Sequence, residues 1–150
     1  MKDIFTSAET SEIINRINKL TPETKPQWGK MSVSQMLAHC NVTYEMAVDN
    51  KYTKAGGLKK FLLKLFIKPV VVNEKPYKRN SRTAPEFLVT DDKNFATEKN
   101  RLINYLQKTQ QMGRKHFEGK DSNSFGPLTA QEWNNMFYKH LDHHLTQFGV

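Results

Sequence analysis

The chain has 150 residues, a single cysteine and a formal net charge of +8. This length suits one domain over residues 1–150, whose core needs neither disulfides nor a structural metal. The lone Cys40 excludes an internal disulfide and suits a reducing compartment, so we expect a cytoplasmic protein. No apolar run is long enough to span a bilayer, and no nucleic-acid-binding motif accompanies the basic residues, so we expect neither partner.

Two amphipathic helices are predicted in the first third of the chain. The first covers about residues 8–20 and the second about residues 33–50. Each follows a capping box, in which Thr6 or Ser32 stands three residues before a Glu or Gln. Both segments place apolar residues at helical spacing, so each is expected to bury one face.

Glycines and prolines interrupt residues 51–90, which predicts a long irregular excursion. Only residues 58–67 look helical within it. The apolar window 58–72 is broken by four lysines and Pro69, so we expect a short buried helix or a loop folded onto the domain.

Two further helices are predicted in the last third of the chain. One begins behind Asp91 or Asp92 and runs to about Gln111, with Gly113 following its end. After a polar loop, the other opens with a Thr129 capping box and continues to the C-terminus. Four amphipathic helices without a credible strand predict an all-α four-helix bundle with the long excursion between its second and third helices.

The last helix carries polar side chains on its apolar stripe. His140, His144 and Gln147 follow one another at i, i+4 and i+7 among large apolar residues. Two imidazoles on successive turns can direct nitrogens at one point, as metal ligands do. The alternative is a pair of core histidines, each bonded to a carbonyl or a tyrosine. For a third ligand, His39 on the second helix is best placed, whereas His116 and His143 lie farther from the bundle interior.

The same residues carry a resemblance to a known superfamily. Met36–His39 on the second helix and His140–Gln147 on the last resemble the DinB/YfiT-like superfamily of four-helix-bundle proteins with a metal site. Further stretches resemble an uncharacterised branch of that superfamily whose domain has no known function. These stretches are Trp28–Met31, Lys75–Tyr77, Thr83–Phe87, Ser124–Thr129 and Gln147–Gly149.

The resemblance implies a metal bound by His39, His140 and His144, with Gln147 as a hydrogen-bonding partner behind the ligands. The branch tends to have a His-Pro pair directly before its Phe-Gly-Pro-Leu-Thr stretch. This chain has His116-Phe117 and a polar insertion instead, so the resemblance assigns no role to His116.

An all-histidine site predicts a divalent metal, with zinc or nickel as first candidates and iron or manganese also open. The resemblance implies a small-thiol-dependent transferase acting on a small molecule; a metal-hydroxide hydrolase is the alternative. A non-catalytic helical bundle is a third hypothesis: it binds a small ligand, or its basic surface binds nucleic acid or an anionic membrane. A homodimer is also open. A zincin-like peptidase is set aside, because Leu141 stands where its catalytic glutamate would be.

A basic run in the excursion is the candidate for holding an anionic substrate or thiol cofactor. It consists of Lys75, Lys78, Arg79 and Arg82. These side chains could act in this way if the excursion folds over the mouth of the metal site, and otherwise they form a solvated loop. Cys40, next to His39, is expected to face the core as a small apolar residue rather than act as a nucleophile.

Overall fold

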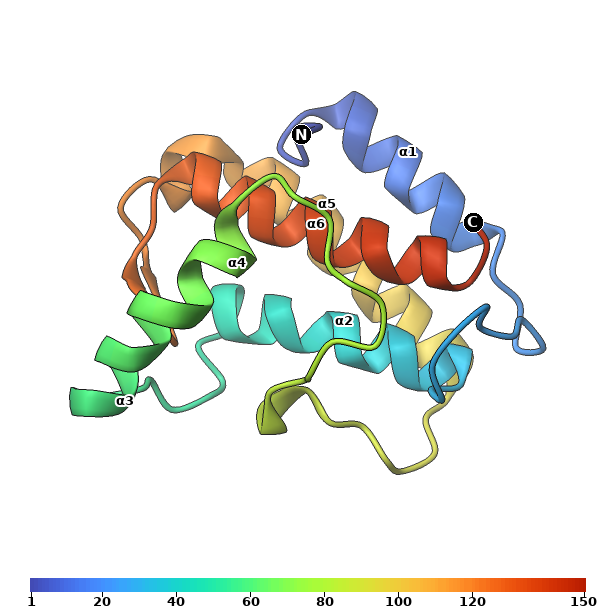
Figure 1. The fold of residues 1–150 in the computed structure, drawn as a ribbon. Helices are drawn as coiled ribbons and strands as arrows, with labels where there is room; N and C mark the ends of the chain where they lie inside the picture. The colour runs from blue at the N-terminus through green and yellow to red at the C-terminus, as the bar shows by residue number, and fades with distance from the viewer.

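The computed structural model describes residues 1–150 and is mostly helical (Figure 1). Four long helices enclose one apolar core. They are α1 (Ser7–Asn18), α2 (Val33–Val48), α5 (Phe95–Phe117) and α6 (Ala130–Gln147). The expectation of a helical domain is confirmed.

Side-chain caps fix where the helices begin. Ser32 and Thr129 form full capping boxes at α2 and α6, as the sequence predicts. At α1 the Thr6 hydroxyl accepts from the Glu9 amide, but the Glu9 carboxylate turns to Lys2 at 3.3 Å, so that predicted box is only half formed. Since α2 and α6 carry the candidate histidines, their two caps set the register of the site.

Aromatic rings fill the centre of the core. The ring of Phe137 on α6 stacks on Tyr44 of α2 and on Trp133 of its own helix, with ring centroids 5.0 Å and 5.3 Å apart. The ring of Phe117, at the end of α5, meets Phe137 edge-on at 5.4 Å. Offset and edge-on rings of this kind stabilise a core beyond their buried area, and they hold α2 and α6 together near the histidines.

A polar network joins α2 to α5. Asn41 donates to the Glu98 carboxylate at 2.8 Å, and Arg101 bridges Glu98, at 2.7 Å, to Glu45. Both carboxylates are buried and hydrogen-bonded, as buried charges must be. The network fixes how far α2 can slide along α5, and hence the position of the helix that carries His39.

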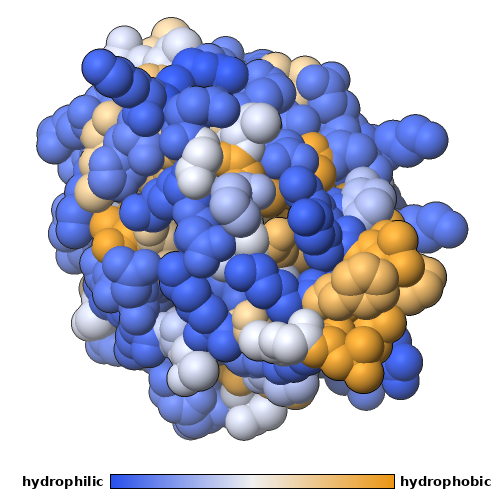
Figure 2. Space-filling model, turned by 90° about the vertical axis from the view of Figure 1, so that its left-hand side faces the viewer, coloured by the Kyte–Doolittle hydropathy of each residue, from blue (hydrophilic) through white to orange (hydrophobic).

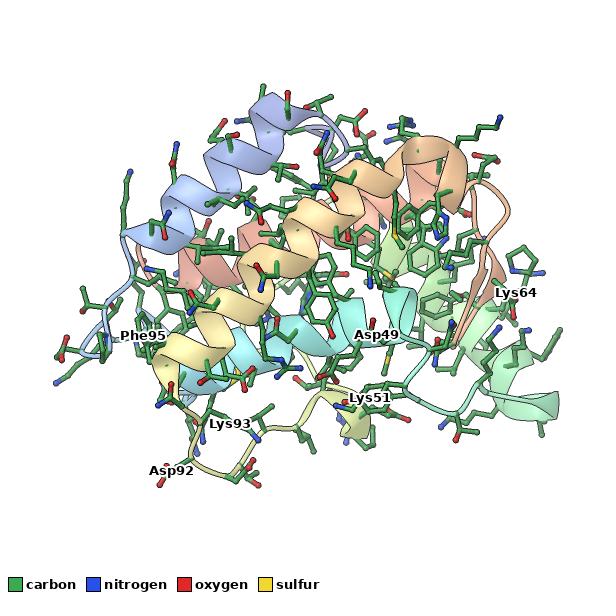
Figure 3. The ribbon with its side chains drawn as sticks, turned by 180° about the vertical axis from the view of Figure 1, so that it is seen from behind. Asp49, Lys51, Lys64, Asp92, Lys93 and Phe95 are labelled. Atoms are coloured by element: carbon green, nitrogen blue, oxygen red, sulfur yellow. The ribbon has the colours of Figure 1, made fainter.

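The third predicted helix is longer than the sequence indicates and begins later. Asn94, rather than Asp91 or Asp92, caps α5, with Phe95 as its first residue (Figure 3). Gly113 leaves the helical conformation at φ 69°, as a residue after a helix end does, but the chain resumes helical turns as far as Phe117. The following polar loop contains a two-residue antiparallel pair that was not expected, β1 (Asp121–Ser122) with β2 (Gly126–Pro127).

The apolar window of the excursion is helical but not buried, contrary to the expectation. It forms α3 (Gly57–Leu62), a π-helical turn η1 (Leu63–Ile67) and α4 (Lys68–Val72), and none of its residues is fully buried. Pro69 does not end the helix, because it stands in the first turn of α4, where no amide donor is needed. Only a few side chains, such as Leu63, Val71 and Val72, pack partly against the core.

The remainder of the excursion, residues 73–94, crosses over α6 and α2 before α5 begins (Figure 1). It contains one 3-10 turn, η2 (Pro85–Phe87), which contacts α2. The excursion therefore lies against the face on which the candidate histidines come together.

None of the helices combines the length and the apolar character that crossing a bilayer requires.

Candidate metal centre

The three candidate ligands come from the middle of α2 and the last turns of α6. His39 is the seventh residue of α2, and His140 and His144 are one turn apart on α6. Residues 101 positions apart in the sequence thus meet where the two helices pack together. The structure brings together the three histidines that the helical pattern and the resemblance both selected.

The three rings form a compact triangle. Ring centroids lie 4.9 Å apart for His39 and His140, 4.5 Å for His39 and His144, and 4.8 Å for His140 and His144. One nitrogen from each ring lies within 4.8 Å of the other two, and the Nε2 atoms of His39 and His140 are 2.8 Å apart. Two nitrogens on a tetrahedral ion at ~2.1 Å are ~3.4 Å apart, so small ring rotations would admit a divalent cation.

The outward nitrogen of each ring has its own hydrogen-bond partner. His39 Nδ1 lies 2.9 Å from the Phe87 carbonyl oxygen, and His144 Nδ1 lies 2.8 Å from Gln147 Oε1. His140 Nδ1 lies 2.9 Å from the Thr43 hydroxyl. Partners on the far side of the ring fix the orientation and tautomer of a metal-binding histidine, and all three rings have one.

These partners determine the tautomer of two histidines. A carbonyl oxygen only accepts, so His39 Nδ1 carries a proton and its Nε2 lone pair points into the triangle. The Gln147 amide nitrogen donates to the Trp28 carbonyl at 2.7 Å, which leaves Oε1 as the acceptor for His144 Nδ1–H. Since His39 Nε2 is unprotonated, His140 Nε2–H donates to it at 2.8 Å in the metal-free protein, and His140 Nδ1 accepts from the Thr43 hydroxyl. In the other tautomer His140 Nδ1–H donates to Thr43, and then three Nε2 lone pairs converge.

Burial keeps the three imidazoles neutral. His39 and His144 are 5 % and 8 % exposed, and His140 retains a partly accessible edge. Burial is the main cause that lowers the pKa of all three, to about 3 for His144 and well below its usual range for His140. The other histidines lower these pKa values further, because each would repel a second positive charge. Neutral imidazole is the form that binds a metal.

The excursion closes one side of the triangle. Phe87, in η2, supplies both the carbonyl that holds His39 and a ring whose centroid lies 5.4 Å from that of His39 and 5.8 Å from that of His140. The excursion therefore does fold over this site, which is the condition on which a role for the basic run depends. Its 3-10 turn orients a candidate ligand and places an aromatic ring over it.

Gln147 links the site to the loop between α1 and α2. Besides its two side-chain bonds, its backbone carbonyl accepts from the Gln27 amide at 2.8 Å. Gly29 allows this close approach: a Cβ built there would lie 2.6 Å from Gln147 Nε2, and its φ of +84° favours glycine. Gly29 thus leaves room for the Gln147 side chain that orients His144, and the Trp28 carbonyl accepts a hydrogen bond from that side chain.

The remaining histidines lie outside the triangle. His116 is exposed, 3.3 Å from Lys120 Nζ. His143 is half-buried, with Trp28 and Tyr77 each 5.8 Å from it between ring centroids, and burial is the main cause that lowers its pKa. Its half-buried position and lowered pKa favour the neutral form of His143.

A cavity of about 180 Å³ lies on the His143 side of α6. Its lining includes Trp28, Tyr77, Arg79, Lys139 and His143. The Arg79 guanidinium lies 4.2 Å from the centre of the Trp28 ring, a stacked arrangement that keeps its donors available. The other members of the basic run, Lys75, Lys78 and Arg82, have exposed side chains that do not line this cavity.

Two hydrogen-bond partners of the histidines, the Phe87 carbonyl and Thr43, were not predicted from the sequence. The Phe87 carbonyl could not be identified, because any residue can offer a backbone oxygen to a ring that reaches it. Thr43 could have been found, because it stands one turn after His39 and therefore lies on the same face of α2. Cys40, by contrast, lies where it was expected: it is 1 % exposed, and burial raises the pKa of its thiol.

The comparisons with known proteins give one match. Residues 4–149 match the sequence profile of a family described as "Protein of unknown function (DUF1569)". No curated protein and no solved structure matches the chain. The match covers nearly the whole chain, including all three histidines of the triangle and their hydrogen-bond partners.

Proposed function

The chain belongs to the DUF1569 family of proteins of unknown function, and we propose that it is a divalent-metal-dependent enzyme with a DinB-like four-helix bundle. His39, His140 and His144 are the proposed ligands, each through Nε2. Gln147, Thr43 and the Phe87 carbonyl are the proposed partners behind them.

One observation carries the proposal: three buried neutral imidazoles converge, and each has its second nitrogen held by a different group. A core histidine pair needs only one bond for each ring and no third histidine. The rings are neutral because burial lowers their pKa values, and only His39 and His140 bond to each other through Nε2, so a cation that uses all three lone pairs fits the cluster. The donor set therefore fits a divalent ion well.

The chemistry of such an ion follows from its ligands. Three histidines contribute no negative charge, so a bound divalent ion keeps its full charge and favours an anionic ligand such as thiolate or hydroxide. When bound, it would act as a Lewis acid that lowers the pKa of a thiol or water. Zinc and nickel suit imidazole nitrogen best, with iron and manganese as further candidates.

The cavity beside His143 is the proposed place for the organic part of a substrate. Its two acidic side chains are already paired, Asp142 with Arg16 at 2.7 Å and Glu74 with the amino group of Met1, which also lines the cavity, at 3.2 Å. Arg79, stacked on Trp28, has no such partner and could bind a carboxylate. This arrangement favours transfer to or from a small anionic thiol over hydrolysis, which stays the alternative.

Metal content and turnover test the proposal separately. Protein purified without a chelating column and loaded with each of zinc, nickel, iron and manganese should hold about one ion per chain. His140→Ala should hold none, whereas His116→Ala, which changes an exposed histidine, should bind like the wild type. Loaded protein is then assayed with small thiols and a panel of electrophiles, and with ester substrates. Stoichiometric metal with ester cleavage alone would favour the hydrolase, and metal binding without turnover would leave a non-catalytic metal-binding bundle.

A further inference from the structure

The helix formed by α3, η1 and α4 presents an apolar face to solvent. Leu58, Phe61, Leu65 and Phe66 on this protruding helix (Gly57–Val72) are 72 %, 61 %, 54 % and 63 % exposed. Figure 2 shows a compact apolar patch on an otherwise hydrophilic face of the molecule. Single exposed apolar side chains are ordinary on protein surfaces, but a contiguous group of them marks a contact surface.

The spacing of these residues shows that the face is organised. Leu58, Phe61, Leu62, Leu65 and Phe66 follow one another at i, i+3, i+4, i+7 and i+8, the spacing of one helix face. The π-helical turn η1 begins just after Leu62 and contains Leu65 and Phe66. A helix normally turns such a stripe to the core, whereas this helix turns it outward.

Lysines flank the apolar face. Residues 51–73 contain six lysines and no aspartate or glutamate. Lys59, Lys60 and Lys68 each have an acidic neighbour within 4 Å. Lys64 has none, and its side chain lies at the periphery of the molecule, far from Phe95 (Figure 3). The ion pairs of Lys59 and Lys60 are exposed and therefore weak, which leaves these two lysines free to exchange partners, whereas Lys68 and Glu132 form a partly buried pair.

We propose that the protruding helix lies on the surface of a membrane that contains anionic lipids. Its apolar side chains would enter the boundary between headgroups and acyl chains, and the lysine stems would extend to the phosphates. The helix is not long and apolar enough to cross the bilayer, so the proposed contact is with the membrane surface alone. It departs from the expectation of no membrane partner, which rested on the lack of a spanning run. The basic surplus of the whole chain, +8, adds to the attraction.

A lipid surface fits this helix better than a second copy of the chain. Two copies that met through the same face would bring their lysines together, with no acidic residue on either protruding helix to pair with them. A single projecting helix also offers a convex surface, which a fluid bilayer accommodates without shape complementarity. The charge and the shape therefore point to the same occupant.

Co-sedimentation with vesicles tests the proposal on the full chain. We expect binding to vesicles of phosphatidylcholine mixed with phosphatidylglycerol, and much weaker binding to phosphatidylcholine alone. Phe61→Ser/Phe66→Ser should weaken binding at least tenfold, because each ring loses its transfer from water. Lys64→Ala should weaken it roughly fivefold at low salt. Leu88→Ser and Lys25→Ala, which change exposed residues outside the helix, should bind like the wild type.

Further readouts guard against misfolding and a different partner. Thermal melting should be the same for all variants, because the substituted side chains are exposed. The tryptophan introduced by Phe66→Trp should shift its fluorescence emission to shorter wavelength when anionic vesicles are added. No binding to anionic vesicles at low salt would overturn the proposal. Binding that Phe61→Ser/Phe66→Ser leaves intact would do so too. A wild-type dimer that this double variant dissociates, without vesicle binding, would assign the face to a second copy.

Discussion

Replacing Gly29 by alanine tests the site from a residue outside the triangle. A Cβ at this position would lie 2.6 Å from Gln147 Nε2, a distance that real contacts do not reach, so the amide must move. Moving it breaks the 2.7 Å bond to the Trp28 carbonyl and releases the Oε1 atom that holds His144. We expect Gly29→Ala to lower metal affinity about 10–100-fold, as loss of a partner behind a ligand does.

The control separates this effect from backbone strain. Gly29 has φ +84°, where alanine costs about 1–2 kcal/mol of stability. Gly119 has φ +71° with open space around its Cβ position, so Gly119→Ala carries similar strain without touching the site. The free energy of unfolding should fall by about 1–2 kcal/mol in both variants, and by about 1 kcal/mol more in Gly29→Ala for the lost hydrogen bond.

Competition for metal against a chromogenic chelator gives the affinity, and urea unfolding gives the stability. In a Gln147→Leu background, Gly29→Ala should have no further effect on metal affinity, because the side chain through which it acts is gone. Equal affinities for Gly29→Ala and Gly119→Ala would refute the role assigned to Gln147.

Three further predictions use simpler readouts. The free energy of unfolding of the metal-free protein should fall as the pH drops from about 6.5 toward 3, because unfolded histidines take up protons that the buried ones refuse. At pH 5 the pKa of about 3 for His144 alone costs about 2 kcal/mol, and a flat pH profile would contradict the burial of the site. Lys139→Met should lower that free energy by about 2–3 kcal/mol, since Lys139 Nζ donates to Val70 O, Asn73 O and Asn73 Oδ1 around the end of α4. The control is Lys115→Met, which changes an exposed lysine, and equal melting temperatures for the two variants would argue against this role. The Cys40 thiol should react with a disulfide reagent only in denaturant, because burial raises its pKa, and rapid labelling of the native protein would reopen a nucleophilic role.

The helices and the candidate ligands were predictable because they depend on local pattern. Ser32 and Thr129 start α2 and α6 through bonds within four residues, and those starts place His39, His140 and His144 on inward faces. The same holds for Gln147, one turn beyond His144. Helical spacing is a property of the sequence itself, so the inward placement of these residues needed no tertiary information. Their assignment as one ligand set with Gln147 behind it came from the resemblance to the DinB/YfiT-like superfamily.

Features that depend on distant parts of the chain could not be predicted. Phe87 reaches His39 only because residues 73–94 cross α6 and α2, and nothing in its own neighbourhood indicates that path. The apolar spacing of Leu58–Phe66 predicts an apolar face but not which way it turns. We expected burial because most such faces are buried; its exposure became visible only in the structure.

The most direct test of the metal site is anomalous diffraction from crystals of the zinc-loaded protein, recorded on either side of the zinc absorption edge. We predict one strong peak about 2.1 Å from the Nε2 atoms of His39, His140 and His144, with Nδ1 of His144 still bonded to Gln147. A crystal without a peak there, or with zinc bound at His116 or another exposed residue while the triangle stays empty, would contradict the account.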